Sequence, residues 1–358
     1  MKPIHLRIMD VSKSFGKVKA LKNVSLDIPK GSFTTFLGPS GCGKSTLLRT
    51  IAGFYDVEKG EIFIGDQRIN DVPSHLRNAI MVFQDYALFP HMSIRENIVY
   101  GLKIKKFSEE EIGRRLDKTV QYLGVKELLE RSPNQLSGGQ QQRIALARAL
   151  IMEPEVLLLD EPLSNLDARL RINIRAELRQ LQKRLGITTI YVTHDQAEAL
   201  ALSDQVAVMN EGEIVQWGSP WEIYFRPRSA FVASFVGTAN LLEGEVVEST
   251  PGGVLVDVGQ ASLRLEGKEG NLPPLGAKVV LCIRPETVEI VDQAQERSSN
   301  IVPGRVRNHI FEGSHFRYWV EALGREIVVD VFDPAEKEIR EDSILLLPPK
   351  RIHIIRDY

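Results

Sequence analysis

Short apolar runs alternate with helical patterns over residues 1–235, and this alternation is typical of a sheet covered by helices. The runs at 156–160 and 188–193 are apolar on both faces, as buried parallel strands are. Residues 206–209 and 214–217 flank a short polar turn and predict a β-hairpin. We therefore expect an α/β domain in this part of the chain.

Helical patterns dominate the segment from about 85 to 150, which predicts a helical subdomain within the α/β domain. Ser108, with Glu111 three residues later, predicts a capping box at the start of an amphipathic helix that runs to about Val120. Ser137 is the expected N-cap of another helix, which continues to Leu150.

The pattern changes after about Asn240, where helical periodicity fades and short β-rich runs separated by glycine and proline follow. Residues 254–258 and 279–283 each follow a turn and predict strands. A small all-β barrel is the expected architecture. We place the domain boundary between 235 and 236, so that the accessory β domain covers residues 236–358.

Composition excludes several classes of protein. The 358 residues suffice for two cores, and the net charge of −2 argues against a general polyanion binder. Residues 241–358 carry 14 Lys and Arg against 20 Asp and Glu, so the barrel is a poor candidate for nucleic acid. Two cysteines imply no disulfide framework, and no run of about 18 apolar residues predicts a membrane span. We expect a chain that is neither secreted nor membrane-spanning.

A phosphate-binding loop occupies residues 38–45 and fits the pattern G-x-x-x-x-G-K-[ST] in full, between the strand-like run 33–37 and a helix-like run. Its glycines let backbone N–H groups close around phosphates, Lys44 would neutralise the terminal phosphates, and the Ser45 hydroxyl would bind Mg²⁺. Cys42 lies at an unconstrained position, and we assign it no redox role. The expected nucleotide contacts are Gly38, Ser40, Gly41, Cys42, Gly43, Lys44, Ser45 and Thr46.

An acidic pair follows the apolar strand 156–160. Alone, such a pair is more often the start of a loop or a helix cap. At the carboxyl end of a parallel strand and in company with a phosphate loop, Asp160 is expected to hold Mg²⁺ through water, and Glu161 to orient or deprotonate the attacking water.

Four further residues are candidates for the nucleotide site only because these motifs are present. Gln84 follows a strand-like run and would reach Mg²⁺ and the water, although a lone glutamine is usually a surface residue. His194 ends another strand and would contact the γ-phosphate, although such a histidine is more often neutral and satisfied. Asp167 would ordinarily be a helix cap. Phe15 would ordinarily belong to the core, yet it precedes the phosphate loop and would stack on a purine.

The run Ser137-Gly138-Gly139-Gln140 provides a second helix start at which bare N–H groups favour an anion. On four residues alone, a flexible turn into a helix is the favoured interpretation.

These motifs, in this order and at these approximate spacings, resemble the nucleotide-binding subunits of ABC transporters over residues 4–235. The resemblance implies that ATP with Mg²⁺ lies between the phosphate loop of one copy and Ser137–Gln140 of a second copy. It further implies that Glu161 is the catalytic base, His194 the γ-phosphate contact, Gln84 a sensor and ligand near Mg²⁺, and Phe15 the adenine stacker. Asp167 belongs to the same set of nucleotide-site motifs.

The resemblance also implies partners. The segment Gln84–Met92 would receive a transmembrane permease subunit, although core packing explains Leu88 and Phe89 equally well. The C-terminal region resembles the OB-type (TOBE) domain of solute importers. The whole chain resembles the ATPases of prokaryotic polyamine and ferric-iron importers, which implies a peripheral subunit on the cytoplasmic membrane face and an indirect solute-binding protein.

Three alternatives remain open from the sequence. A repair ATPase of the SMC type would need a long coiled coil after Gln84, but only about 50 residues separate Gln84 from Leu136 and no sustained heptads occur. A non-transport regulator on the same fold is disfavoured by Glu161 and His194. The ATPase half of an exporter would lack the C-terminal barrel.

Overall fold

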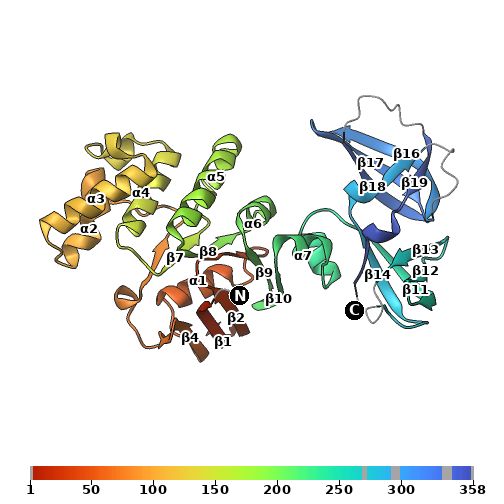
Figure 1. The fold of residues 1–358 in the computed structure, drawn as a ribbon, viewed down its shortest axis with the longest axis horizontal. Coiled ribbons are helices and arrows are strands. Elements are labelled where there is room, and N and C mark those ends of the chain that lie inside the picture. Colours follow the sequence, from red (N-terminus) through yellow and green to blue (C-terminus); the bar gives the residue numbers. More distant parts are fainter. Residues whose placement is uncertain (1–2, 268–271, 292–298, 333–340, 356–358) are drawn as a thin grey trace. The chain divides into compact units, whose positions relative to one another are not determined.

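The apolar runs of the first 220 residues form a six-stranded sheet of order β10-β9-β3-β8-β7-β6 (Figure 1). Its strands are β3 (Phe33–Leu37), β6 (Ala79–Val82), β7 (Val156–Asp160), β8 (Thr188–Thr193), β9 (Gln205–Asn210) and β10 (Glu213–Gly218). All pairings are parallel except the β9–β10 hairpin. Every residue of β3, β7 and β8 is buried, which confirms the expectation of buried strands for β7 and β8.

The structure, a computed structural model, describes residues 3–267, 272–291, 299–332 and 341–355. It divides into two compact units, Met1–Pro220 and Trp221–Tyr358, and each is described separately. The boundary between residues 235 and 236, which separates the expected α/β domain from the accessory β domain, remains a prediction.

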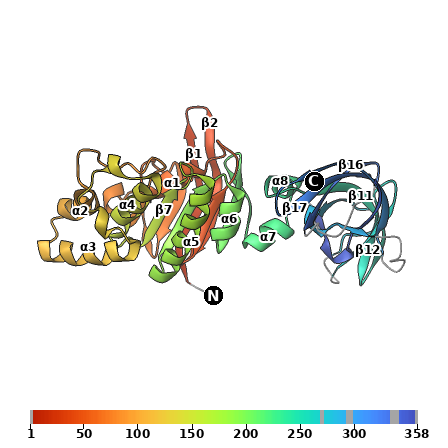
Figure 2. The same ribbon diagram turned by 90° about the horizontal axis from the view of Figure 1, so that it is seen from above.

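The central sheet has different layers on its two faces (Figure 2). A four-stranded antiparallel sheet of order β2-β1-β4-β5 and helix α1 pack on one face, where Leu158 of β7 joins their core. Helices α4, α5 and α6 pack on the other face, where Leu157 and Leu159 contribute. Alternate residues of one strand therefore serve two cores, as the two-residue period of a strand requires. The sequence pattern did not separate the antiparallel strands, which are β1 (Ile4–Phe15), β2 (Val18–Pro29), β4 (Lys59–Ile64) and β5 (Gln67–Arg68).

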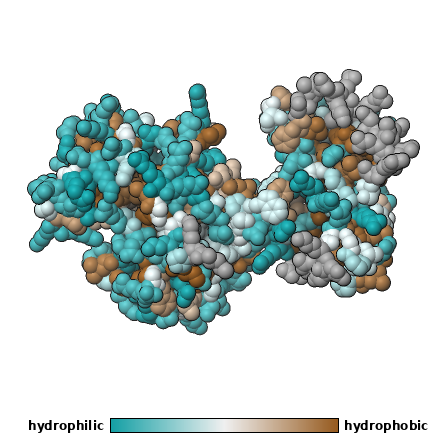
Figure 3. Space-filling view, in the orientation of Figure 1, coloured by the Kyte–Doolittle hydropathy of each residue, from teal (hydrophilic) through white to brown (hydrophobic). Residues whose placement is uncertain are grey.

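The helices of this unit are α1 (Lys44–Ala52), α2 (Ile94–Ile104), α3 (Glu109–Leu123), α4 (Gly138–Leu150), α5 (Ala168–Leu185) and α6 (Gln196–Leu202). Short 3₁₀ turns occupy Ser74–Leu76, Lys126–Leu128 and Pro133–Gln135. Helices α2, α3 and part of α4 share a separate apolar core, within the segment expected to be helical. In the first unit, apolar side chains form small separate areas on the face that Figure 3 shows.

The expected helix starts are partly right. Ser137 and Gln140 form a complete capping box at the start of α4. At α3, the Ser108 side chain accepts a hydrogen bond from the Glu111 N–H, but the second half of the expected box is missing. The Glu111 carboxylate instead binds Arg114 and Arg115, because two guanidinium groups one turn further along the helix stabilise it more than a single backbone N–H. These hydrogen bonds lower the pKa of Glu111 to about 2.

The second unit is all-β apart from short helices, in agreement with the expected fold class. One five-stranded sheet has the order β13-β12-β11-β14-β20 and the other β15-β19-β16-β17-β18. Both contribute to one core, in which Leu242, Val256 and Leu281 meet Val320 and Leu345. The strands are β11 (Asn240–Thr250), β12 (Gly253–Asp257), β13 (Ser262–Glu266), β14 (Lys278–Ile283), β15 (Glu289–Val291), β16 (Ile301–Phe311), β17 (His315–Ala322), β18 (Arg325–Phe332), β19 (Asp342–Leu346) and β20 (Ile352–Ile355). Among the described residues, no helix is long and apolar enough to span a bilayer.

A buried arginine fastens the helices that precede the β domain. Arg284, only 2% exposed, donates hydrogen bonds to the carbonyls of Tyr224, Ala233 and Thr238. These carbonyls lie in or next to α7 (Pro220–Phe225) and α8 (Ala230–Phe235). The sequence offered no signal for this contact, because the partners are backbone atoms about 50 residues away.

We expect Arg284→Met to loosen α7 and α8. The stem of the side chain keeps its volume, but several buried carbonyl hydrogen bonds are lost, which should cost roughly 3 kcal/mol or more. Hydrogen–deuterium exchange should accelerate at residues 221–240 and not at residues 33–52. The matched control is Arg325→Met, since exposed Arg325 donates a single hydrogen bond to Leu241 O. Unchanged protection of residues 221–240 in Arg284→Met would contradict the role of this contact.

Candidate nucleotide-binding and catalytic site

The phosphate-binding loop connects β3 to α1 and is shaped by its glycines. Gly43 has φ +106°, and a Cβ there would lie 2.5 Å from the Ala20 carbonyl oxygen, so that only glycine fits. Lys44, 5% exposed, donates from Nζ to the carbonyls of Gly38 at 2.7 Å and Pro39 at 2.8 Å. None of the ion pairs within the described part of the chain involves Lys44. Among the described residues, no carboxylate therefore lies within ion-pair distance of this buried ammonium group.

A cavity of about 400 Å³ lies beside this loop. Besides Val18 and Ala20, its lining comprises Lys19, Lys22, Ser40, Gly41, Gly43, Lys44, Ser45, Thr46, Glu161, Glu211 and Gly212. Three lysines face two glutamates there, a balance that suits an anion. Sequence analysis missed Lys19, Lys22, Glu211 and Gly212. No sequence motif marks these residues. The β9–β10 turn is joined to the phosphate loop by a hydrogen bond from Gly212 N to Cys42 O at 3.0 Å.

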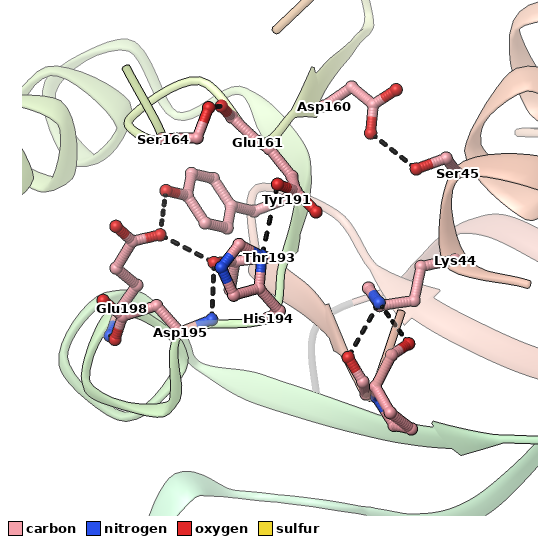
Figure 4. A network of polar contacts seen from close by, with 12 residues as sticks. Lys44, Ser45, Asp160, Glu161, Ser164, Tyr191, Thr193, His194, Asp195 and Glu198 are labelled. Carbon is pink, nitrogen blue, oxygen red and sulfur yellow. Dashed lines mark hydrogen bonds and ion pairs between the residues drawn. The ribbon is translucent and has the colours of Figure 1, made fainter. Parts of the chain in front are cut away.

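Ser45 and Asp160 face each other across the site (Figure 4). The Ser45 hydroxyl donates to Asp160 Oδ1 at 2.8 Å, and Arg49 Nη2 lies 3.4 Å from Asp160 Oδ2. Asp160 is 4% exposed at the carboxyl end of β7. A hydroxyl and a carboxylate held together fit the oxygen ligands that Mg²⁺ prefers.

Burial raises the pKa of the Cys42 thiol, which favours its neutral form and agrees with a packing role.

Glu161 and His194 are in contact. His194 Nδ1 lies 3.2 Å from Glu161 Oε2, and the two residues follow the neighbouring strands β7 and β8. Glu161 has φ +44°, a left-handed conformation that costs free energy in a residue with a Cβ. Its carbonyl accepts from Ser164 Oγ at 2.9 Å and its N–H donates to Val192 O at 3.0 Å, so the turn is held from both sides. The geometry thus presents a carboxylate beside an imidazole next to Ser45 and Lys44 in the same site (Figure 4).

Not all predicted site residues line this cavity. Four of them contact a lining residue without lining the cavity themselves: Gly38 and Cys42 contact Lys44, Asp160 contacts Ser45, and His194 contacts Glu161. The remaining predicted residues lie elsewhere on this unit. Gln84 is exposed, and its carbonyl accepts from Asn165 Nδ2 at 2.9 Å. Phe15 is 45% exposed and packs edge-on against Tyr55. Asp167 caps α5 through a hydrogen bond from Leu170 N, as a helix cap would. Ser137–Gln140 form the first turn of α4, and none of these four residues lines the cavity. Within one chain, the N-terminus of α1 lines the cavity and the N-terminus of α4 does not.

Residues 85–92 are held in place by side chains of the helical segment. Arg148 of α4 donates to the carbonyls of Tyr86 at 2.8 Å and Ala87 at 2.6 Å, and the buried Asn97 of α2 makes hydrogen bonds with Phe89 and Met92. Leu88 and Phe89 are only partly exposed, so core packing accounts for much of their apolar character. The exposed residues of this segment are Asp85, Ala87, Pro90 and His91.

A second cavity, of about 340 Å³, lies at the opposite, amino ends of β7 and β8. Its lining includes His5, Lys118, Tyr122 and Thr188 and none of the predicted site residues. The chemistry of the motifs therefore gathers at the carboxyl ends of the strands, where α/β sheets bind ligands.

Comparison with known proteins identifies the family. Residues 21–164 match the ABC transporter family model, and residues 281–353 match the TOBE domain. The Thermotoga maritima spermidine/putrescine import ATP-binding protein PotA is 45% identical over 94% of this chain and 92% of its own length. The Fusobacterium nucleatum Fe(3+) ions import ATP-binding protein FbpC is 43% identical over 96% of this chain and 88% of its own. The Thermococcus litoralis trehalose/maltose import ATP-binding protein MalK is 47% identical over 84% and 82%.

Solved structures share the fold of the first unit. The cbiO1 protein of Clostridium perfringens, part of an ABC transporter complex, is 34% identical over 62% of this chain and 91% of its own, with a TM-score of 0.58. The dimeric bacterial ABC transporter cassette MJ0796 is 33% identical over 60% of this chain and 98% of its own, with a TM-score of 0.54. Fold and site thus define an ATP-binding ABC-type ATPase with a C-terminal TOBE domain. The chain belongs to the family of ATP-binding subunits of ABC importers, as its resemblance to that family implied.

Proposed function

We propose that this chain hydrolyses ATP with Mg²⁺ at two sites formed between two copies, and that hydrolysis drives uptake of a small solute through membrane subunits. The observation that carries the proposal is the grouping of Lys44, Ser45, Asp160, Glu161 and His194 at one edge of the sheet. Such a grouping supplies a cation for the phosphates, oxygen ligands for a metal ion and a base for water.

Each residue has a distinct role in the proposed reaction. The Glu161 carboxylate accepts the proton of the water whose oxygen attacks the γ-phosphorus, and the bond from that phosphorus to the β–γ bridging oxygen breaks. His194 donates a hydrogen bond to a γ-phosphate oxygen, while Lys44 neutralises charge on the β- and γ-phosphates. Ser45 and Asp160 would hold Mg²⁺, with Gln84 as a further ligand, and the ion would neutralise phosphate charge.

The separation of Ser137–Gln140 from the cavity supports the proposal that this run serves the nucleotide of a second copy. The N–H groups of Gly138 and Gly139, which the capping box does not use, would face the γ-phosphate from across the dimer. ATP binding would therefore close the dimer and hydrolysis would reopen it. Asp167 would lie at the same interface, and Phe15 would stack on adenine.

The relatives support an importer, and they differ in solute: spermidine and putrescine, ferric ions, or trehalose and maltose. We propose a small charged solute of the polyamine or ferric-iron kind. We further propose that residues 1–235 form the ATPase and 236–358 the accessory domain. The chain would lie at the cytoplasmic face of the membrane, contact permease subunits through Gln84–Met92, and cooperate indirectly with a solute-binding protein.

An ATPase assay of the purified protein tests this function. We expect turnover that requires Mg²⁺ and is lost in Lys44→Ala, because the buried ammonium is the only lysine within the phosphate loop itself. Lys126→Ala, an exposed lysine on a 3₁₀ turn, is the control and should match wild type. ATP binding without any Mg²⁺-dependent turnover would favour the non-hydrolysing regulator instead.

A further inference from the structure

A buried carboxylate lies directly behind His194. Glu198, on α6, is 3% exposed, and its Oε2 accepts hydrogen bonds from Tyr191 OH at 2.7 Å and Thr193 Oγ1 at 2.8 Å (Figure 4). Tyr191 and Thr193 alternate along β8 and so point to the same face of the sheet. Thr193 immediately precedes His194 in the chain. Glu198 thus holds the end of the strand that presents the imidazole.

The same contacts fix the backbone on the other side of His194. Asp195 N donates to Thr193 Oγ1 at 3.0 Å, so this hydroxyl accepts one hydrogen bond while it donates another to Glu198. Asp195 in turn caps α6, since its Oδ1 accepts from Glu198 N at 3.1 Å. The residues before and after His194 are therefore tied to one carboxylate and to the helix that carries it.

An arginine connects this arrangement to the Asp167 segment. Arg171 of α5 lies with Nε 3.9 Å from Glu198 Oε1 and with Nη1 3.4 Å from Asp195 Oδ2, and its Nη2 donates to Leu166 O at 3.0 Å. Leu166 directly precedes Asp167. The Glu198 carboxylate thus accepts hydrogen bonds from two hydroxyl groups and lies within ion-pair distance of a guanidinium group.

We propose that Glu198 is a positioning residue for His194, and that Arg171 links it to the segment that ends at Asp167. The inference rests on the proposed role of His194 at the γ-phosphate. A buried carboxylate is a costly way to fill space between α6 and β8, where an apolar side chain would pack as well. Its contacts instead converge on the two residues that flank His194. Glu198 therefore acts through the orientation of the imidazole and does not touch the nucleotide.

Two variants test the hydrogen bond between Thr193 and Glu198 from its two sides. Glu198→Gln keeps the shape of the side chain without its charge, and Thr193→Val keeps the shape of the threonine without its hydroxyl. We expect kcat at saturating ATP to fall about 10-fold or more in both, with KM for ATP changed less than about threefold. Thr193→Ser retains the hydroxyl and should restore most of the activity. Ser203→Ala is the control, because it removes a comparable hydrogen bond, from Ser203 Oγ to Thr35 Oγ1 at 2.6 Å, away from His194.

Measuring Glu198→Gln in a protein that also carries His194→Ala distinguishes an effect on the position of His194 from an effect on stability. If Glu198 acts through His194, Glu198→Gln should change kcat less than about twofold in that background, while its effect on Tm persists. With ¹³C-labelled histidine, the Cε1–H resonance of His194 should shift in Glu198→Gln and Thr193→Val but not in Ser203→Ala. An unmoved His194 resonance, or equal losses of kcat in both backgrounds, would overturn the inference. An unchanged kcat in His194→Ala together with a shifted resonance would instead refute the proposed role of His194 and leave the positioning intact.

Discussion

Replacing Glu161 by glutamine is expected to lower ATP turnover by roughly 10²- to 10⁴-fold and to leave ATP binding intact. The substituted side chain would keep its shape and a hydrogen bond with His194, but an amide cannot accept the proton of the attacking water. Because hydrolysis would no longer reopen the dimer, ATP should hold two copies together. Steady-state turnover with Mg²⁺ and size-exclusion chromatography with light scattering in ATP measure the two effects.

The matched control for this substitution is Glu109→Gln, which changes an exposed glutamate in the first turn of α3. It should turn over ATP at the wild-type rate and show no trapped dimer. If Glu161→Gln also kept the wild-type rate, another group would have to be the base, and the left-handed backbone at Glu161 would need another explanation.

The second large effect concerns the sharing of sites between two copies. One protomer carrying Lys44→Ala paired with another carrying Ser137→Arg should keep one intact site, made of Lys44 from the second and Ser137 from the first. A wild-type protomer paired with one that carries both changes should keep none, because each site then contains one defect. Single-turnover hydrolysis in tagged mixed dimers should therefore proceed at one site in the first pairing and be nearly lost in the second.

Both mixed dimers contain the same two substitutions and the same number of wild-type residues, so the pairings differ only in how the two changes are distributed between the protomers. Ser137→Ala in place of Ser137→Arg gives a milder version, since it removes the helix cap without adding a bulky cation beside a phosphate. Equal rates in the two pairings would show that Ser137 and Lys44 do not serve one shared nucleotide.

Much of the first unit could be predicted because its signals are local. The apolar runs of β7 and β8, the β9–β10 hairpin, and the Ser137 cap each lie within a few consecutive residues, and the structure has all of them. The capping box at Ser108 was half wrong for the opposite reason. Whether Glu111 turns back to the backbone or forward to Arg114 depends on a competition between partners that the motif does not contain.

The predicted site residues needed more than local signals. Asp160 reaches Ser45 across 115 residues, and Glu161 meets His194 only because β7 and β8 are neighbours in a parallel sheet. The order of the motifs suggested such a meeting, since carboxyl ends of parallel strands lie at one edge. Lys22 and Gly212 could not be found in this way, because a strand and a hairpin turn without a phosphate motif bring them to the loop.

The sequence by itself determined the class of protein, the chemistry of the phosphate loop and the presence of a separate β-rich region, because these depend on residue types at short, fixed spacings. Only the tertiary structure decided which side chains meet: that Glu198 holds the strand end before His194, that Arg284 fastens α7 and α8, and that Ser137–Gln140 lie outside the cavity of their own chain. The physical reason is that hydrogen bonds and burial act over a few ångströms in space. Arg284 and its carbonyl partners lie about 50 residues apart in the chain, and the contact of Glu198 with Thr193, only five residues away, depends on how α6 packs against β8.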